Sequence, residues 1–167
     1  SFPTRRSSDL GSMSKLENKI EARHRSLFDV LNEQKYTVDY FQREYSWEEK
    51  HIEELVTDLS SAFLSEYTPG DKREQGEQYN NYYLGPFVVS SKDGKRSIID
   101  GQQRLTSLTL FLIYLHNLQK ELGFDEKIEP MIFSELRGSK SFNITVNERI
   151  PCLNGLFSHG EYVADEN

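Results

Sequence analysis

A short strand that runs directly into a buried helix is the feature that most constrains the fold of this chain. Residues Ser97 to Thr106 read SIIDGQQRLT, so that two isoleucines are followed at once by Asp100, Gly101 and the start of a helix. The helix continues over residues 105–118 and is apolar around most of its circumference, which is typical of a central, buried helix. This junction predicts a domain that contains both a sheet and helices.

Other elements follow from the spacing of apolar residues. A capping-box pattern at Ser46 and Glu49 starts one helix, and the pair Asp93–Gly94 is the turn of a β-hairpin. The sequence predicts helices over 14–31, 46–63, 105–118 and 151–157, strands over 36–40, 82–90, 98–99 and 142–146, and an exposed loop over 67–81. Because helices and strands alternate, the fold class is α/β or α+β, with a small sheet packed against helices.

Composition and charge exclude several classes of function. The 167 residues carry 20 basic and 27 acidic side chains, a net charge of −7, so no global positive field attracts nucleic acid or anionic lipid. The single cysteine, Cys152, excludes an internal disulfide and a multi-cysteine zinc site. No apolar run approaches the roughly 20 residues that a membrane-spanning helix needs, so we expect a cytoplasmic protein with no membrane partner.

The two ends of the chain differ from its middle. The first ten residues, SFPTRRSSDL, show no periodicity and look like the translation of a sequencing adapter, with a disordered tail as the alternative. We therefore expect residues 1–12 to lie outside the fold, residues 13–125 to form the domain, and residues 126–167 to begin a following region. The polar end of the chain follows an apolar group that has nothing after it to pack against, so we expect the fold to be incomplete at the C-terminus.

The strand-to-helix junction can bind an anion. The first N–H groups of a helix have no internal partners, and the helix dipole adds partial positive charge there. Gly101 lets the backbone approach a phosphate, Arg104 supplies a forked guanidinium, and Asp100 could hold a divalent cation or orient water. In the alternative interpretation Asp100 caps the helix and Arg104 pairs with an acid. A second Gly-x-x-Arg string occurs at residues 70–73, but no predicted strand precedes it and no predicted helix follows it, so we expect no anion site there.

A second cluster precedes the helix expected after Ser46. Gln42, Arg43, Tyr45 and Trp47 combine an amide and an arginine with aromatic rings, which could stack on a base and contact its phosphates. The alternative is that the aromatic residues belong to the core and that the arginine is solvated. The four histidines are scattered without metal-ligand spacing, and neither a nucleophile elbow nor a Walker A string occurs.

These clusters together resemble the N-terminal domain of GmrSD-type modification-dependent restriction systems. Three motifs carry the resemblance in matching order and spacing: Phe41 to Trp47, Tyr82 to Gly85, and Ile99 to Thr106. The resemblance covers about residues 16–120. The family's usual Ile-Pro before the first motif is replaced here by Val38 and Asp39, which adds a negative charge near the expected pocket.

The resemblance implies a ParB/sulfiredoxin-like fold that binds a nucleoside triphosphate and hydrolyses it to license DNA restriction in phage defence. It implies catalytic roles for Asp100, Gln103 and Arg104, with Mg²⁺ held indirectly at Asp100. The phosphate- and nucleotide-binding residues that it implies are Gly101, Gln102, Arg104, Gln42, Arg43, Tyr45 and Trp47.

The resemblance also implies an HNH-type nuclease domain or subunit as partner, and contact with DNA only through the complete protein. Two other functions compete with nucleotide hydrolysis, and the sequence disfavours the second. The domain could be a nucleotide-gated protein-interaction module without turnover. A sulfiredoxin-like reductase would need a cysteine in the phosphate loop, and residues 100–106 contain none.

Overall fold

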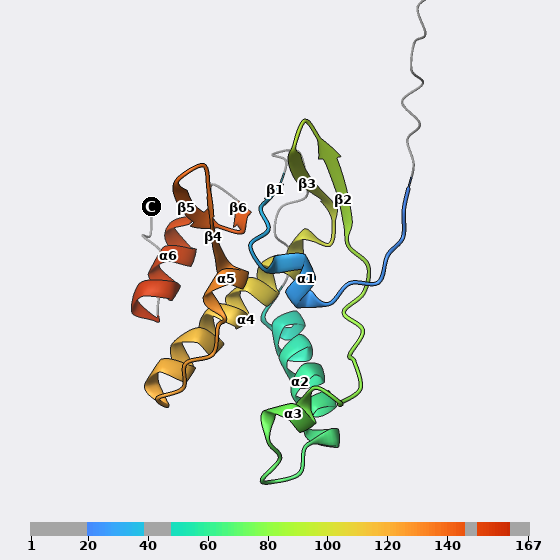
Figure 1. Ribbon diagram of the computed structural model, residues 1–167, viewed down its shortest axis with the longest axis vertical. Helices are drawn as coiled ribbons and strands as arrows, with labels where there is room; N and C mark the ends of the chain where they lie inside the picture. Colours follow the sequence, from blue (N-terminus) through green and yellow to red (C-terminus); the bar gives the residue numbers. More distant parts are fainter. Residues whose placement is uncertain (1–19, 39–47, 146–149, 161–167) are drawn as a thin grey trace, which may run out of the picture.

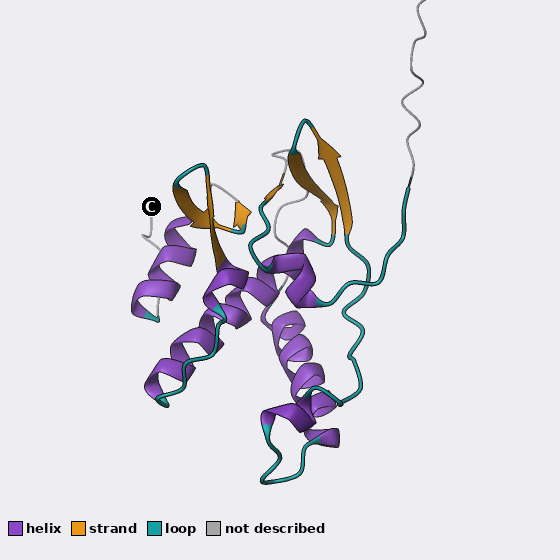
Figure 2. Ribbon diagram, viewed as in Figure 1, coloured by secondary structure: helices purple, strands orange, loops and turns teal. Residues whose placement is uncertain are grey.

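The computed structural model describes residues 20–38, 48–145 and 150–160 (Figure 1). Its elements follow one another as α1 (Leu27–Leu31), β1 (Tyr36–Val38), α2 (Glu49–Glu66), α3 (Arg73–Gly76), β2 (Val88–Lys92), β3 (Lys95–Asp100), α4 (Gln102–Glu121), α5 (Glu129–Ile132), β4 (Phe133–Leu136), β5 (Ser139–Phe142), β6 (Ile144–Thr145) and α6 (Ile150–His159). Figure 2 shows the helices and strands interspersed along the chain, so the mixed α+β class predicted from the sequence is confirmed.

The main sheet has the strand order β2-β3-β1-β6. β2 and β3 form an antiparallel hairpin, whereas β1 runs parallel to both β3 and β6. In the register, Val38 lies opposite Ile98, which is fully buried. A separate two-stranded sheet, β4–β5, is antiparallel. β3 lies between β2 and β1 in the sheet, buries Ile98, and leads directly into α4.

The central helix α4 provides much of the core. Its buried side chains include Leu105, Leu108 and Ile113, and α1, α5, β6 and α6 contribute further apolar residues to the same cluster. Buried hydroxyls on α4 donate to carbonyls one turn earlier, as Thr109 does to Leu105 O at 2.9 Å. The predicted buried helix is therefore confirmed, although Tyr114 is 60% exposed and α4 leaves one face open.

A single buried amide connects three elements around α4. Asn143 is 1% exposed, and its Nδ2 donates to Leu31 O at 2.7 Å and to Pro130 O at 2.9 Å. Its Oδ1 accepts from the Ser134 hydroxyl at 2.7 Å. The end of α1, α5 and β4 are thus connected through one side chain. Residues beyond 125 supply this amide, β6 of the main sheet and part of the core cluster.

The helix predicted over 14–31 is wrong over residues 20–26 and is confirmed over residues 27–31. Residues 20–26 are not helical, and α1 begins only at Leu27. Ser26 accepts from the Asp29 N–H at 3.0 Å through its hydroxyl, while the Asp29 carboxylate accepts from the Ser26 N–H at 3.2 Å. This capping box fixes the start of the helix, and the apolar spacing before it does not form a buried face, since Ile20 is 97% exposed.

The second helix also begins later than predicted. α2 starts at Glu49, and the Glu48 N–H donates to His51 Nδ1 at 2.9 Å; Ser46 lies outside the described residues. The predicted apolar stripe is present, but only Leu55 is buried. The loop predicted over 67–81 is mostly exposed and contains the single helical turn α3.

The Asp93–Gly94 hairpin is confirmed, with φ values of 51° and 75° at the two turn residues. The predicted strand over 82–90 is wrong over 82–87, because β2 begins at Val88. The single strand predicted over 142–146 is divided in the structure: β5 ends at Phe142, and β6 joins the other sheet. The helix predicted over 151–157 is confirmed as α6. None of the helices that the structure describes is long and apolar enough to cross a membrane.

The Asn143 connection predicts a large stability effect. Asn143→Ala removes both donors from Leu31 O and Pro130 O and the acceptor from Ser134, and buried groups left without partners are costly. We expect the free energy of unfolding to fall by about 2–4 kcal/mol in a denaturant titration. Asn80→Ala is the matched control, because Asn80 is exposed and its Nδ2 donates to the Glu66 carboxylate at 2.6 Å on the surface. A loss below about 0.5 kcal/mol in both variants would contradict this role of Asn143.

Candidate functional site

The junction between β3 and α4 depends on the backbone of Gly101. This residue is the N-cap of α4 and has φ 88° and ψ 9°, in the left-handed region that side chains disfavour. A Cβ at this position would lie 2.5 Å from the Phe87 ring and 3.2 Å from Pro86 O. Both the backbone conformation and the available space therefore require glycine where the strand turns into the helix.

The turn leaves the first N–H groups of α4 without acceptors in their own helix. The first intrahelical bond is from the Leu105 N–H to Gly101 O, at 3.0 Å. The N–H groups of Gln102, Gln103 and Arg104 consequently have no acceptor within the helix. Their orientation, together with the dipole of a 20-residue helix, favours a negative charge at this end.

Arg104 is held beside the junction by the segment before β2. Its Nη1 donates to Pro86 O at 3.2 Å, and its guanidinium carbon lies 5.7 Å from the centre of the Phe87 ring. A Cβ at Gly85, which has φ 91°, would lie 2.9 Å from Nη1. Across residues 20–38, 48–145 and 150–160 no ion pair to Arg104 is present. Its positive charge is therefore positioned by neutral neighbours.

Asp100 is exposed, and its Oδ1 accepts from the N–H of Gly101 at 2.9 Å. The donor is the N–H of the N-cap residue itself, which precedes the helix, and no side chain caps the N–H groups of α4. The alternative interpretation, in which Asp100 caps the helix and Arg104 pairs with an acid, does not match the contacts among the described residues. The described residues contain no group of three histidine, cysteine or acidic side chains able to hold a metal ion.

The two glutamines of the junction differ in accessibility. The side chain of Gln102 is buried, at 9% exposure, so only its backbone N–H faces the helix end. Gln103 is half-buried, and its carbonyl accepts from the Ser107 hydroxyl at 2.9 Å. Of the two amides, that of Gln103 is the more accessible to a ligand at the junction.

Tyr82 connects this junction to α2. Its hydroxyl donates to the Asp58 carboxylate at 3.1 Å. Desolvation raises the pKa of Tyr82, the bond to Asp58 acts in the same direction, and the charge of Arg104 acts against both. The aromatic segment 82–87 therefore lies between α2 and the junction. The composition of this segment predicts a strand and does not predict these contacts with the site; the signal present in the sequence is its Tyr82–Gly85 motif.

Four of the predicted nucleotide-binding residues, Gln42, Arg43, Tyr45 and Trp47, lie outside the described residues. The structure therefore brings together Asp100, Gly101 and Arg104, with the backbone of the two glutamines, and adds Gly85 and Phe87. The cluster of Gln42, Arg43, Tyr45 and Trp47 is not among the residues that it describes.

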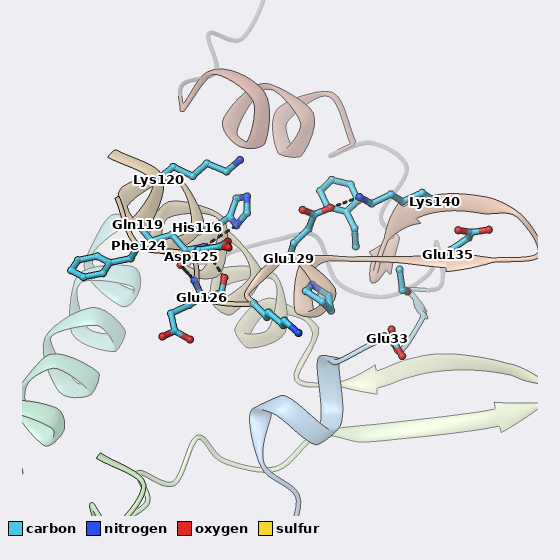
Figure 3. Close-up of a pocket in the computed structure, with 14 residues that line it drawn as sticks. Glu33, His116, Gln119, Lys120, Phe124, Asp125, Glu126, Glu129, Glu135 and Lys140 are labelled. Atoms are coloured by element: carbon cyan, nitrogen blue, oxygen red, sulfur yellow. Dashed lines mark hydrogen bonds and ion pairs between the residues drawn. The ribbon is translucent and has the colours of Figure 1, made fainter. Parts of the chain in front are cut away.

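A hollow of about 450 Å³ lies at the opposite end of α4 (Figure 3). We call it the α4–α5 hollow. It is lined by the end of α4, the connection to α5, and the β4–β5 hairpin, through Glu33, His116, Gln119, Lys120, Phe124, Asp125, Glu126, Lys127, Glu129, Pro130, Phe133, Ser134, Glu135 and Lys140. None of the site residues predicted from the sequence lines it.

Residues 26–161 match the family model described as GmrSD restriction endonuclease, N-terminal domain. The match covers most of the chain and includes the junction, the segment 82–87 and α6. No curated protein matches the chain.

The close contact at Gly101 predicts that this glycine cannot be replaced without strain. Gly101→Ala combines an unfavourable φ with a collision against Phe87, and we expect it to destabilise the fold by about 2–4 kcal/mol in a thermal or denaturant unfolding experiment. Gly94→Ala is the matched control, because Gly94 also has a positive φ but has open space around its Cα. Equal losses in the two variants would mean that the contact with Phe87 contributes nothing.

Proposed function

This chain belongs to the family of GmrSD restriction endonuclease N-terminal domains, and we propose that within a restriction system it binds a nucleoside triphosphate at the β3–α4 junction and hydrolyses it. The observation that carries the proposal is the position of Arg104. Its guanidinium is held by Pro86 O and Phe87, without an acidic partner among the described residues, beside the N–H groups that begin α4.

The backbone of the junction would bind the phosphates. N–H groups at residues 102–104 can donate to phosphate oxygens, because they begin α4 and point along its axis. Arg104 can donate to the same phosphate through two nitrogens at once, because its planar guanidinium matches the spacing of phosphate oxygens. The net charge of −7 does not oppose this binding, since the site provides local positive charge.

Asp100 and Gln103 would carry the remaining chemistry. The Oδ1 of Asp100 is engaged by Gly101, which leaves Oδ2 to face a Mg²⁺ ion or one of its waters. A single protein carboxylate fits Mg²⁺, which in nucleotide sites takes most of its ligands from phosphates and water. When bound, the ion neutralises charge that develops on the phosphates. Gln103 would orient the attacking water through its half-buried amide, and Arg104 would stabilise the transferring phosphoryl group.

Calorimetric titration with a nucleoside triphosphate and Mg²⁺ tests the binding site. We expect Arg104→Ala to weaken binding by about tenfold or more, because a charge-assisted, two-point contact is lost. Arg73→Ala is the matched control: it lies in the other Gly-x-x-Arg string of the chain, on exposed α3, where it pairs with Glu126 at 2.7 Å. Equal affinity of the wild-type protein and Arg104→Ala, or no binding by either, would overturn the assignment.

Phosphate release separates an enzyme from a nucleotide-gated interaction module. We expect turnover by the wild-type chain and a loss of about a hundredfold in Asp100→Ala, since the anchor for Mg²⁺ is removed. Thermal unfolding of the variant serves as the folding control. If the protein binds nucleotide but releases no phosphate, even with the nuclease partner and DNA present, hydrolysis is refuted and the domain is a nucleotide-gated interaction module.

A further inference from the structure

We propose that the α4–α5 hollow is a second ligand site, which binds a small carboxylate between His116 and Lys120. This site is separate from the nucleotide site, because His116 lies 14 residues along α4 from Gln102, about 20 Å at the rise of an α-helix. The proposal goes beyond nucleotide binding and uses none of its residues. It depends on a hydrogen-bond donor that the fold buries and that has no acceptor among the described residues.

The orientation of the Gln119 amide is fixed by the backbone of Glu126. Its Oε1 accepts from the backbone N–H of Glu126 at 2.8 Å, and its Nε2 donates to the carbonyl of the same residue at 2.9 Å. A backbone N–H can only donate and a carbonyl can only accept, so this pair of contacts fixes which end of the amide carries the hydrogens. The second hydrogen on Gln119 Nε2 is then available to His116.

The tautomer of His116 follows from that orientation. Gln119 Nε2 lies 3.4 Å from His116 Nδ1, and because Gln119 is the donor, Nδ1 must accept. Desolvation lowers the pKa of His116, and the charge of Lys120 lowers it further against an opposing effect of Glu129, so the ring is neutral near neutral pH. A neutral ring that accepts at Nδ1 carries its proton at Nε2.

That Nε2–H is a buried donor without an acceptor. His116 is 5% exposed, and its Nε2 has no hydrogen-bond partner in the part of the chain that the structure describes. The ring cannot readily turn away, because it stacks on Phe157 of α6 with a centroid distance of 5.1 Å and an interplanar angle of 9°. Buried donors are rarely left unpaired, so an acceptor oxygen in the hollow would complete the site.

Lys120 indicates that the acceptor is negatively charged. Its Nζ lies 5.6 Å from the centre of the Phe157 ring, the ring on which His116 stacks, and it forms no ion pair within the described segments. Figure 3 shows the His116 ring and the Lys120 side chain turned toward the side of the hollow where Glu129 and Lys140 lie. An anionic oxygen there could accept from both donors.

The rest of the lining selects a small, singly charged ligand. Glu129 pairs with Lys140, and Glu126 pairs with Arg73 at 2.7 Å, so these two acids are already neutralised. The further acids that line the hollow, Glu33, Asp125 and Glu135, would repel a ligand of high negative charge such as a nucleoside triphosphate. Phe124, Pro130 and Phe133 supply apolar surface, which favours a carboxylate attached to an apolar body.

Titration of protein labelled with ¹⁵N-histidine tests this site. We use benzoate as the probe, with acetate and inorganic phosphate for comparison, and follow the Nε2–H resonance of His116. We expect a saturable shift with benzoate, a weaker one with acetate because it lacks the apolar body, and none with phosphate. The exposed His24 and His159 serve as internal references that should not move. A saturable response to phosphate alone, or to none of the probes, would overturn the proposal.

Two variants show whether the named residues hold the ligand. Lys120→Gln should weaken benzoate binding by about tenfold, whereas Lys127→Gln, which also lines the hollow, should leave it within about twofold. Both lysines are exposed, so neither change should prevent folding. His116→Phe keeps the stacked ring but removes the donor, and calorimetry should then detect no benzoate binding. Unchanged binding in Lys120→Gln or His116→Phe would refute the site.

Discussion

The contact between Gly101 and Phe87 is the constraint on which the arrangement of this domain depends. It allows β3, which is paired in parallel with β1 inside the sheet, to turn within one residue into α4. Because α4 supplies much of the core, the direction of that turn determines where α5, β6 and α6 can pack. The same turn exposes the start of α4 and positions Arg104 against Gly85 and Pro86. One local backbone requirement thus underlies both the core and the candidate site.

The elements with strong local signals were predictable from the sequence. α4 was recognisable from its continuous apolar residues, and the β2–β3 turn from Asp93–Gly94, since both positions need a positive φ. The junction itself was also predictable, because a β-branched strand, a glycine and an apolar helix follow one another without a gap. In these segments local propensity and tertiary packing favour the same structure.

Segments whose structure depends on distant partners were not predictable. The apolar spacing before Ser26 suggested a long helix, but the capping box with Asp29 begins the helix at Leu27. Residues 82–87 have the composition of a strand, yet Gly85, Pro86 and Phe87 lie against Arg104 and Gly101. Apart from the Tyr82–Gly85 motif, no local pattern indicates that contact. Asn143 interrupts an apparently continuous strand because its amide bonds to Leu31 and Pro130, from other parts of the chain.

The most direct measurement of the central claim is a map of backbone amide shifts when a nucleoside triphosphate with Mg²⁺ is added to the ¹⁵N-labelled chain. A nucleotide bound at the β3–α4 junction should cause the largest shifts at the N–H groups of Gln102, Gln103 and Arg104, with a smaller effect at Gly85, because these groups surround the free end of the helix. Shifts confined to the α4–α5 hollow, or absent throughout the chain, would contradict the account.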